Sequence, residues 1–182
     1  LEGEEGDTGN SYASGDKENL LLPGLQRELM EAVADVGKPV IFCLMAGSAI
    51  DLSYPMEHFG AILQLWYPGA RGGKSVADIL FGEVSPSGKL PVTFYDGLEQ
   101  LPEFTDYHME GRTYRYMKGR AQYPFGFGLT YGDVAVVDAR VDGVTEEVDS
   151  FGFPDVCIKV TVANEGMRDT DDVVQLYIKN AV

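Results

Sequence analysis

The sequence has few of the residues that build redox, metal or nucleic-acid sites. Its 182 residues include two cysteines, two histidines and one tryptophan, and 14 lysines and arginines stand against 29 aspartates and glutamates, for a formal net charge of −15. Such an acidic surface repels phosphate backbones, which argues against nucleic-acid binding. With His58 and His108 as the only histidines, a zinc site has little support, and we predict no cofactor and no metal. Cys43 and Cys157 lie in apolar runs and are predicted to be buried free thiols.

The chain also lacks an apolar run long enough to span a membrane, while its 45% hydrophobic residues suffice for a core. No signal-peptide pattern opens it. We therefore expect a soluble protein and leave its compartment, cytoplasmic or secreted, unassigned.

The first two thirds of the chain alternate helical and extended patterns. After an acidic loop over residues 1–19, Pro23 predicts the start of a helix that Gly37 ends. Its apolar face consists of Leu25, Leu29, Ala32, Val33 and Val36. Strands are predicted over 39–45, 61–66 and 92–95, an irregular or helical link over 50–59, and a helix from about 72 that stops at Gly82. The fold class is therefore α/β, with a partial parallel-sheet α/β sandwich.

Residues 96–118 have a mixed pattern, and the apolar period changes after Tyr131. The tract 111–116 is aromatic and strand-like, and 123–131 is a Gly- and aromatic-rich connector. Beyond it the apolar period becomes two, with strands expected over 156–162 and 173–179, which predicts the beginning of an antiparallel β-sandwich. We predict domains at 1–126 and 127–182, and an unpaired edge on the last strand that could pair with another copy of the chain.

Two motifs could suggest other chemistry. Gly73, Lys74 and Ser75 stand between a strand and a helix, as in a phosphate-binding loop, but Pro68 occupies the position of the first glycine and removes an N–H that the phosphate would need. Ser48 lies outside a G-x-S-x-G elbow, so a serine hydrolase is not predicted either.

The candidate catalytic residues are carboxylates in the first loop. Glu2, Glu4 and Glu5 cluster there, and a carboxylic acid with a raised pKa can serve as a general acid. Retaining glycoside hydrolysis also needs a nucleophilic carboxylate about 5–5.5 Å away, and the chain offers no obvious partner. Residues and spacing alone stop at an α/β domain followed by the beginning of a β-sandwich.

The stretch from Trp66 to Tyr95 resembles the glycoside hydrolases of family 3. The matching motifs are Tyr67-Pro-Gly69, Gly72-Gly73, Val76-Ala-Asp78, Leu80-Phe-Gly82, Pro86-Ser-Gly88, Leu90-Pro91 and Thr93. The tracts Gly111–Tyr116, Tyr123–Tyr131, Val160–Gly166 and Val174–Tyr177 are similar to the family as well. The last two resemble its fibronectin-III-like domain, which implies that the β-sandwich is an incomplete domain of that type.

This resemblance implies retaining hydrolysis of β-linked glycosides, such as oligosaccharides or aryl glycosides, from the non-reducing end. It implies a nucleophilic aspartate on an N-terminal barrel domain, which this chain lacks. The acid/base is assigned by resemblance to Glu4, with Glu5 next and Glu2 third. The tracts lean toward β-xylosidases, with β-glucosidases close behind.

The chain is thus expected to be a fragment of a larger enzyme, with no activity on its own. The alternative is a non-catalytic carbohydrate-binding or structural module that uses the aromatic residues between Tyr114 and Tyr131.

Overall fold

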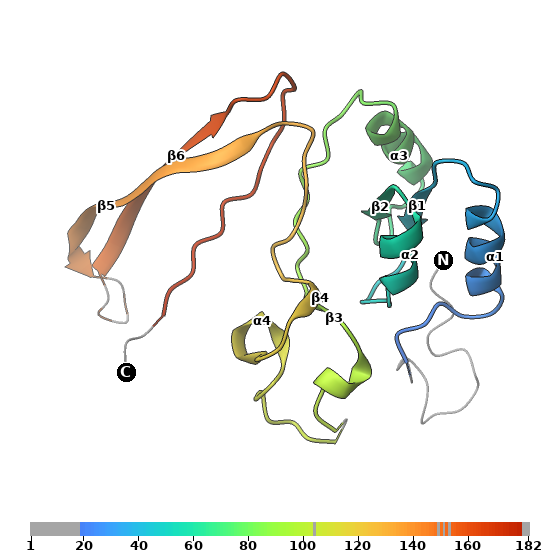
Figure 1. The fold of residues 1–182 in the computed structure, drawn as a ribbon. Helices are drawn as coiled ribbons and strands as arrows, with labels where there is room; N and C mark the ends of the chain where they lie inside the picture. Colours follow the sequence, from blue (N-terminus) through green and yellow to red (C-terminus); the bar gives the residue numbers. More distant parts are fainter. Residues whose placement is uncertain (1–18, 104, 149, 151, 153, 180–182) are drawn as a thin grey trace. The chain divides into compact units, whose positions relative to one another are not determined.

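The computed structural model describes residues 19–179 except 104, 149, 151 and 153 (Figure 1). It contains both helices and sheets, as the α/β prediction requires, and it divides into two units. The first unit comprises residues 1–77 and 89–127, and the second comprises 78–88 and 128–182. The domain division at 126/127 stays a prediction.

A parallel strand pair forms the centre of the first unit. Strand β1 (Ile41–Leu44) pairs with β2 (Ala61–Gln64), so that Ile41 lies opposite Ala61 and Leu44 opposite Gln64. Helix α2 (Ser53–His58) makes the connection between them, in the stretch expected to be an irregular or helical link. The parallel pairing of these two strands is confirmed, and each strand is shorter than its apolar run.

Helix α1 (Gln26–Ala34) precedes this pair and starts three residues after Pro23, because Gly24 takes a left-handed φ of +62° and delays the helix. Its buried side chain is Met30. The apolar face seen in the sequence is largely exposed among the described residues, with Leu25 at 71% and Leu29 at 63%. The described part of the first unit therefore buries the side of α1 that carries Met30 and leaves the more apolar side open.

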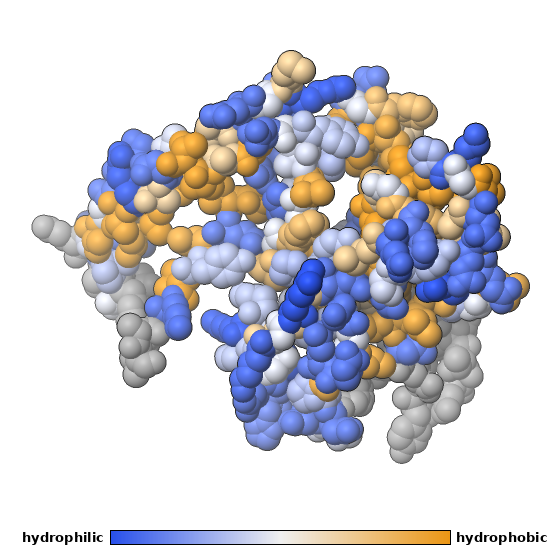
Figure 2. Space-filling view, viewed as in Figure 1, coloured by the Kyte–Doolittle hydropathy of each residue, from blue (hydrophilic) through white to orange (hydrophobic). Residues whose placement is uncertain are grey.

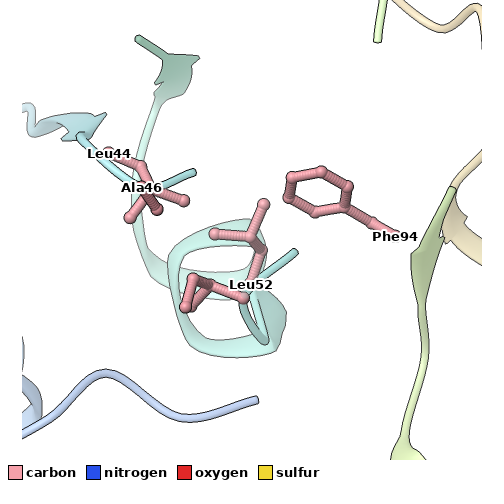
Figure 3. Close-up of a cluster of buried hydrophobic side chains, with 5 residues drawn as sticks. Leu44, Ala46, Leu52 and Phe94 are labelled. Carbon is pink, nitrogen blue, oxygen red and sulfur yellow. The ribbon is translucent and has the colours of Figure 1, made fainter. Parts of the chain in front are cut away.

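The hydrophobic core of the first unit joins segments that are distant in the sequence. Its fully buried members are Leu44, Ala46, Ile50, Leu52 and Phe94. Figure 3 shows the ring of Phe94 pointing from β3 (Phe94–Tyr95) toward Leu52. Burial of a side chain of this size contributes about 1.5–3 kcal/mol, so the contact between β3 and the loop after β1 is a substantial part of what holds this unit together.

Two predicted strands of the first unit take other forms. The strand predicted over 92–95 is reduced to β3, which pairs antiparallel with β4 (Ala121–Tyr123) instead of extending the parallel pair. The tract predicted as a strand over 111–116 forms helix α4 (Thr113–Tyr116), preceded by the short 3-10 helix η1 (Leu98–Gln100). The strand prediction was wrong because Thr113 has a φ of +56° and its N–H donates to Tyr95 Oη at 2.7 Å, which turns the chain.

The last helix of the first half is α3 (Gly72–Leu80). It ends two residues before Gly82, whose φ is +76°, so the predicted glycine stop is confirmed. None of the described helices is long and apolar enough to cross a lipid bilayer.

The second unit contains a long antiparallel hairpin. Strand β5 (Val134–Val148) pairs with β6 (Pro154–Asn164), and Val134 lies opposite Asn164. Figure 2 shows apolar side chains at the surface over this hairpin, which include Val136, Val141, Val144 and Val156. The completed fibronectin-III-like sandwich stays a prediction.

The strand predicted over 173–179 is not formed. Its side chains are exposed, with Leu176 at 62% and Ile178 at 86%. A strand is stable only in a hydrogen-bonded ladder, and the alternating sequence finds no ladder within the described residues. Pairing of this stretch with another copy of the chain stays a prediction.

The two cysteines are free thiols in different environments. Cys43 on β1 is half-buried, and desolvation raises its pKa. Cys157 on β6 is exposed, so its predicted burial was wrong. The apolar alternation of β6 predicted a covered strand, but only Ile158, Val160 and Ala163 are partly buried there.

Candidate functional site

The glutamates assigned to catalysis, Glu2, Glu4 and Glu5, lie outside the described residues. The structure does describe where their segment joins the fold. The carbonyl of Leu20 accepts the N–H of Asp51 at 2.7 Å, and Leu22 packs against the core. Since Asp51 follows β1, Leu20 is attached to the loop at the end of that strand.

In α/β sheets, ligands bind outside the carboxyl ends of the strands. We use the term carboxyl edge for the loops at 45–51 and 65–71, which follow β1 and β2. Two hydrogen bonds tie these loops together: Leu65 N–H donates to the carbonyl of Leu44 at 2.8 Å, and Gln64 Nε2 donates to that of Ala46 at 2.8 Å. Gln64 Oε1 is buried and has no hydrogen-bond partner among the described residues, a position that a bound water ordinarily satisfies.

The backbone turns sharply where β2 enters the carboxyl edge. Trp66 has a φ of +53°, in the left-handed region, which costs a non-glycine residue about 1–2 kcal/mol. Its side chain packs against the core, while the next side chain, Tyr67, is 71% exposed. Packing of Trp66 therefore holds a strained turn that directs Tyr67 outward.

The ring of Tyr67 lies directly on the backbone of the neighbouring loop. A Cβ atom added at Gly47 would be 2.6 Å from Tyr67 Cε2 and 2.7 Å from its Oη. Only glycine fits at position 47 with the ring in this place. The hydroxyl end of the ring thus contacts the loop after β1, and the side chain remains mostly exposed.

Asp51 is a carboxylate at this edge, and its hydrogen bonds hold it ionised. Its Oδ1 accepts from Ser53 N–H at 2.9 Å and from Gln122 Nε2 at 3.2 Å. Burial acts to raise its pKa, but hydrogen bonds from Ser53 and Gln122 and the charge of Arg27 outweigh it and lower the pKa. A carboxyl group with a lowered pKa is a poor general acid at neutral pH, so Asp51 positions the loop and is not the proton donor.

The aromatic tract considered as a sugar platform is mainly packed on itself. Tyr114 and Phe125 stack with ring centroids 4.3 Å apart, and Tyr123 and Phe127 lie 5.0 Å apart. Tyr114 is nevertheless 49% exposed, so part of this stack faces solvent. The tract is therefore chiefly a packed connector, with an exposed ring at its surface.

The segment that resembled a phosphate loop is closed by its own contacts. The N–H of Gly72 donates to the carbonyl of Gly69 at 3.1 Å, and a Cβ at Gly72 would meet Pro68 at 2.6 Å. The N–H groups of Lys74 and Ser75 likewise donate within the turn, to the carbonyl of Arg71. This arrangement supports a packing role for Gly72 but not for Gly73, where an added Cβ would meet nothing within 4 Å.

The second unit has a separate polar hollow of about 310 Å³. Its lining residues are Gly82, Glu83, Ser85, Tyr131, Met167, Arg168 and Asp169. Hydrogen bonds already occupy several of these groups: Arg168 Nη1 donates to the carbonyl of Gly82 at 2.8 Å, and Tyr131 Oη donates to that of Ile79 at 3.0 Å. No group of three acidic, histidine or cysteine side chains suited to a metal ion occurs in the described part of the chain. The hollow is better explained as packing within the second unit, between residues 82–85 and residues 131 and 167–169.

Comparison with known families decides where this chain belongs. Residues 2–131 match the glycosyl hydrolase family 3 C-terminal domain. The chain belongs to glycosyl hydrolase family 3. The resemblance in the sequence is confirmed, and the matched part of the family's hydrolases is their C-terminal domain.

Curated relatives of this family 3 chain are named β-xylosidases and β-glucosidases. It is 42% identical over 181 residues to a xylan 1,4-β-xylosidase of Xylanibacter ruminicola, a match of 99% of this chain and 20% of the relative. It is 32% identical over 184 residues to a periplasmic β-glucosidase of Salmonella typhimurium, covering 94% of this chain and 24% of the relative. The chain thus spans about a fifth of the length of these relatives.

Solved family 3 structures share its fold. DesR, a β-glucosidase from Streptomyces venezuelae solved with D-glucose, superimposes with a TM-score of 0.70 at 31% identity, covering 86% of this chain and 21% of DesR. The exo-β-xylosidase XlnD, solved with a xylobiose aziridine probe, gives a TM-score of 0.61 at 31% identity, covering 67% of this chain and 17% of XlnD.

Sequence reasoning missed two features of the carboxyl edge. The support of Tyr67 by Gly47 could have been suspected, because a glycine directly after a buried strand often marks a close approach. The hydrogen bond from Leu52 N–H to Gln122 Oε1 could not have been predicted, since 70 residues separate the two.

Proposed function

We propose that this chain is part of a retaining, exo-acting β-glycosidase of the β-xylosidase or β-glucosidase type. The observation that carries the proposal is the match to a xylan 1,4-β-xylosidase along 99% of the chain. Because the chain spans only 20% of that relative, the remainder of the enzyme, including the barrel domain with its nucleophilic aspartate, belongs to a longer polypeptide.

In this proposal Glu4 is the acid/base, with Glu5 and then Glu2 as substitutes. The glutamate protonates the glycosidic oxygen as the leaving group departs, and the aspartate of the barrel forms the glycosyl–enzyme bond. The ionised glutamate then removes a proton from the water that breaks this bond. Attachment of its segment at Leu20, beside the carboxyl edge, supports a place next to bound substrate.

The test compares leaving groups in the full-length enzyme. Glu4→Gln is expected to lower kcat/KM about 10²- to 10⁴-fold for a methyl β-xyloside, whose alkoxide needs protonation. For 2,4-dinitrophenyl β-xyloside, whose leaving group needs none, kcat/KM should change little. Glu5→Gln and Glu2→Gln are the matched controls and should retain both activities. A selective loss in Glu5→Gln would move the acid/base role to Glu5.

The separate 182-residue chain should be inactive, because retaining hydrolysis requires a second carboxylate that the chain does not offer. Incubation of the purified chain with aryl β-xyloside and β-glucoside measures this directly. Turnover above the background of a Glu4→Gln chain would contradict the proposal.

A second candidate is a non-catalytic carbohydrate-binding module. The exposed part of the Tyr114–Phe125 stack favours it, since such a ring can contact the apolar face of a sugar. Titration of xylo- and gluco-oligosaccharides into the chain separates the two candidates. Saturable binding that Phe125→Ala or Tyr131→Ala abolishes would support the module.

A further inference from the structure

We infer that residues 173–179 are a self-complementary strand through which a second copy of this chain binds. The inference goes beyond the proposed function and does not depend on it. Its starting point is a stretch that has the sequence of a strand and joins no ladder within the described residues. A second copy is the partner that its pattern of apolar and charged side chains fits.

The stretch has the composition of a pairing strand. Residues 173–178 read Val-Val-Gln-Leu-Tyr-Ile, with no charge, no glycine and no proline. Branched and aromatic residues favour strands, and an uncharged run of this kind tends to pair with the identical run of another copy. Its apolar side chains are exposed among the described residues. An extended, uncovered run of this kind offers an edge for pairing.

The two sides of the stretch differ. Tyr177 Oη donates to Gln175 Oε1 at 2.6 Å, so these two side chains share a side, as residues two apart do in an extended chain. Val174, Leu176 and Ile178 therefore lie on the opposite side, which is wholly apolar.

One antiparallel register brings the apolar sides of two copies together. When Leu176 lies opposite Leu176 of the second copy, Val174 lies opposite Ile178, and the apolar side chains of both copies form one continuous surface. A shift by one residue would move one copy's apolar side chains to the other face. The register is two-fold symmetric, the usual symmetry of soluble dimers.

The charges at the ends of the stretch favour this register. Lys179 lies opposite Val173 of the second copy and diagonally across from its Asp171, within reach of a lysine side chain. The symmetry repeats this opposite-charge pair at the other end. A parallel, in-register pair would instead place Asp171 beside Asp171 and Lys179 beside Lys179, and adjacent like charges destabilise a ladder.

The experiment measures sedimentation of the 182-residue chain as its concentration is raised. A single strand pair is a small interface, so the average mass should rise from 19.9 kDa toward twice that value between about 10 µM and about 1 mM. Leu176→Asp places two carboxylates opposite each other at the two-fold axis and should keep the chain monomeric. Val144→Asp changes an exposed valine of the hairpin and is the matched control, which should dimerise as wild type does.

Exchange of the end charges tests the register. Lys179→Asp and Asp171→Lys each place like charges on the diagonal, and each should weaken dimerisation several-fold. The two changes shift the net charge in opposite directions, so a general charge effect could not weaken dimerisation in both. The double variant Asp171→Lys/Lys179→Asp restores opposite charges in exchanged positions and should regain the wild-type dissociation constant.

Three results would overturn the inference. One is a chain that stays monomeric throughout the concentration range. Another is a dimer that withstands Leu176→Asp or that Val144→Asp dissociates, because it would use a different surface. The third is a double variant that does not recover, which would exclude the antiparallel register. Hydrolysis of β-glycosides tests the proposed function separately, so either proposal can fail while the other stands.

Discussion

Gln122 holds the loop after β1 with both ends of its side-chain amide. Its Oε1 accepts the N–H of Leu52 at 2.8 Å, and its Nε2 donates to Asp51 Oδ1 at 3.2 Å. Leu52 is 2% exposed, so its N–H has little access to water as a substitute partner. One side chain on β4 thus fixes the loop that forms half of the carboxyl edge.

Replacement of Gln122 should therefore be costly. Gln122→Ala leaves the buried N–H of Leu52 without its acceptor, and we expect a loss of about 1–3 kcal/mol in the free energy of unfolding, measured by chemical denaturation. The matched control is Gln100→Ala, because Gln100 also bridges two segments but in an exposed position. Its loss should be below about 1 kcal/mol, and equal losses would contradict the assigned role of Gln122.

Asp51 should make stability depend on pH in the acid range. Its pKa is lowered in the folded chain, so its contribution is fully present above the unfolded pKa of about 3.9 and disappears as the pH falls through the folded value. Asp51→Asn keeps the shape but cannot ionise. The difference in Tm between pH 7 and pH 3 should be smaller in this variant than in wild type, and identical differences would show that Asp51 is not the source.

Gly82 should tolerate no side chain. At φ +76° an alanine is strained by about 1–2 kcal/mol, whereas its Cβ, 3.5 Å from Arg168 Nη2, would make only an ordinary van der Waals contact. Gly82→Ala is expected to lower the free energy of unfolding by that amount in urea titrations. Gly73→Ala, in open space at the beginning of α3, should be neutral or stabilising by up to about 1 kcal/mol.

The loop from Glu103 to Arg112 should depend on a guanidinium group. Arg112 Nη2 donates to the carbonyls of Glu103 at 3.1 Å and Asp106 at 2.6 Å, and its Nε donates to that of His108 at 3.3 Å. A lysine ammonium cannot reproduce this planar set of donors. Arg112→Lys should increase hydrogen exchange of the backbone amides in the loop several-fold, whereas Arg115→Lys should not. Unchanged exchange in Arg112→Lys would mean that the loop is held by other contacts.

Local sequence signals predicted the elements that local chemistry determines. Apolar runs gave the parallel pair β1 and β2, and Gly82 gave the end of α3. These signals failed where a distant partner decides the conformation. The tract 111–116 was predicted as a strand, but the hydroxyl of Tyr95, 18 residues away, accepts the N–H of Thr113 where helix α4 begins. The stretch 173–179 has the alternation of a strand but no ladder to join within the described residues.

For the candidate site, the sequence predicted the kind of chemistry better than it predicted the arrangement of the side chains. Glutamates in a loop suggested a general acid, and family motifs assigned it to Glu4. The position of Tyr67 depends on a strained turn at Trp66 and on a contact with Gly47, which lies in the neighbouring loop. The glycine hints at a close approach, but its partner is not visible in the sequence, because the contact arises only when the strands pair.

The separation of Leu52 and Gln122 along the chain also delays completion of the core during translation. The core around Leu44 and Leu52 is incomplete until Phe94 has been made, and the hydrogen bond that locks it needs Gln122, 70 residues after Leu52. Ribosomes add about 5–20 residues per second, so these apolar side chains wait about 4–14 s for their last partner. During that interval they are open to capture by chaperones. The β5–β6 hairpin joins residues close in sequence and needs no comparable delay.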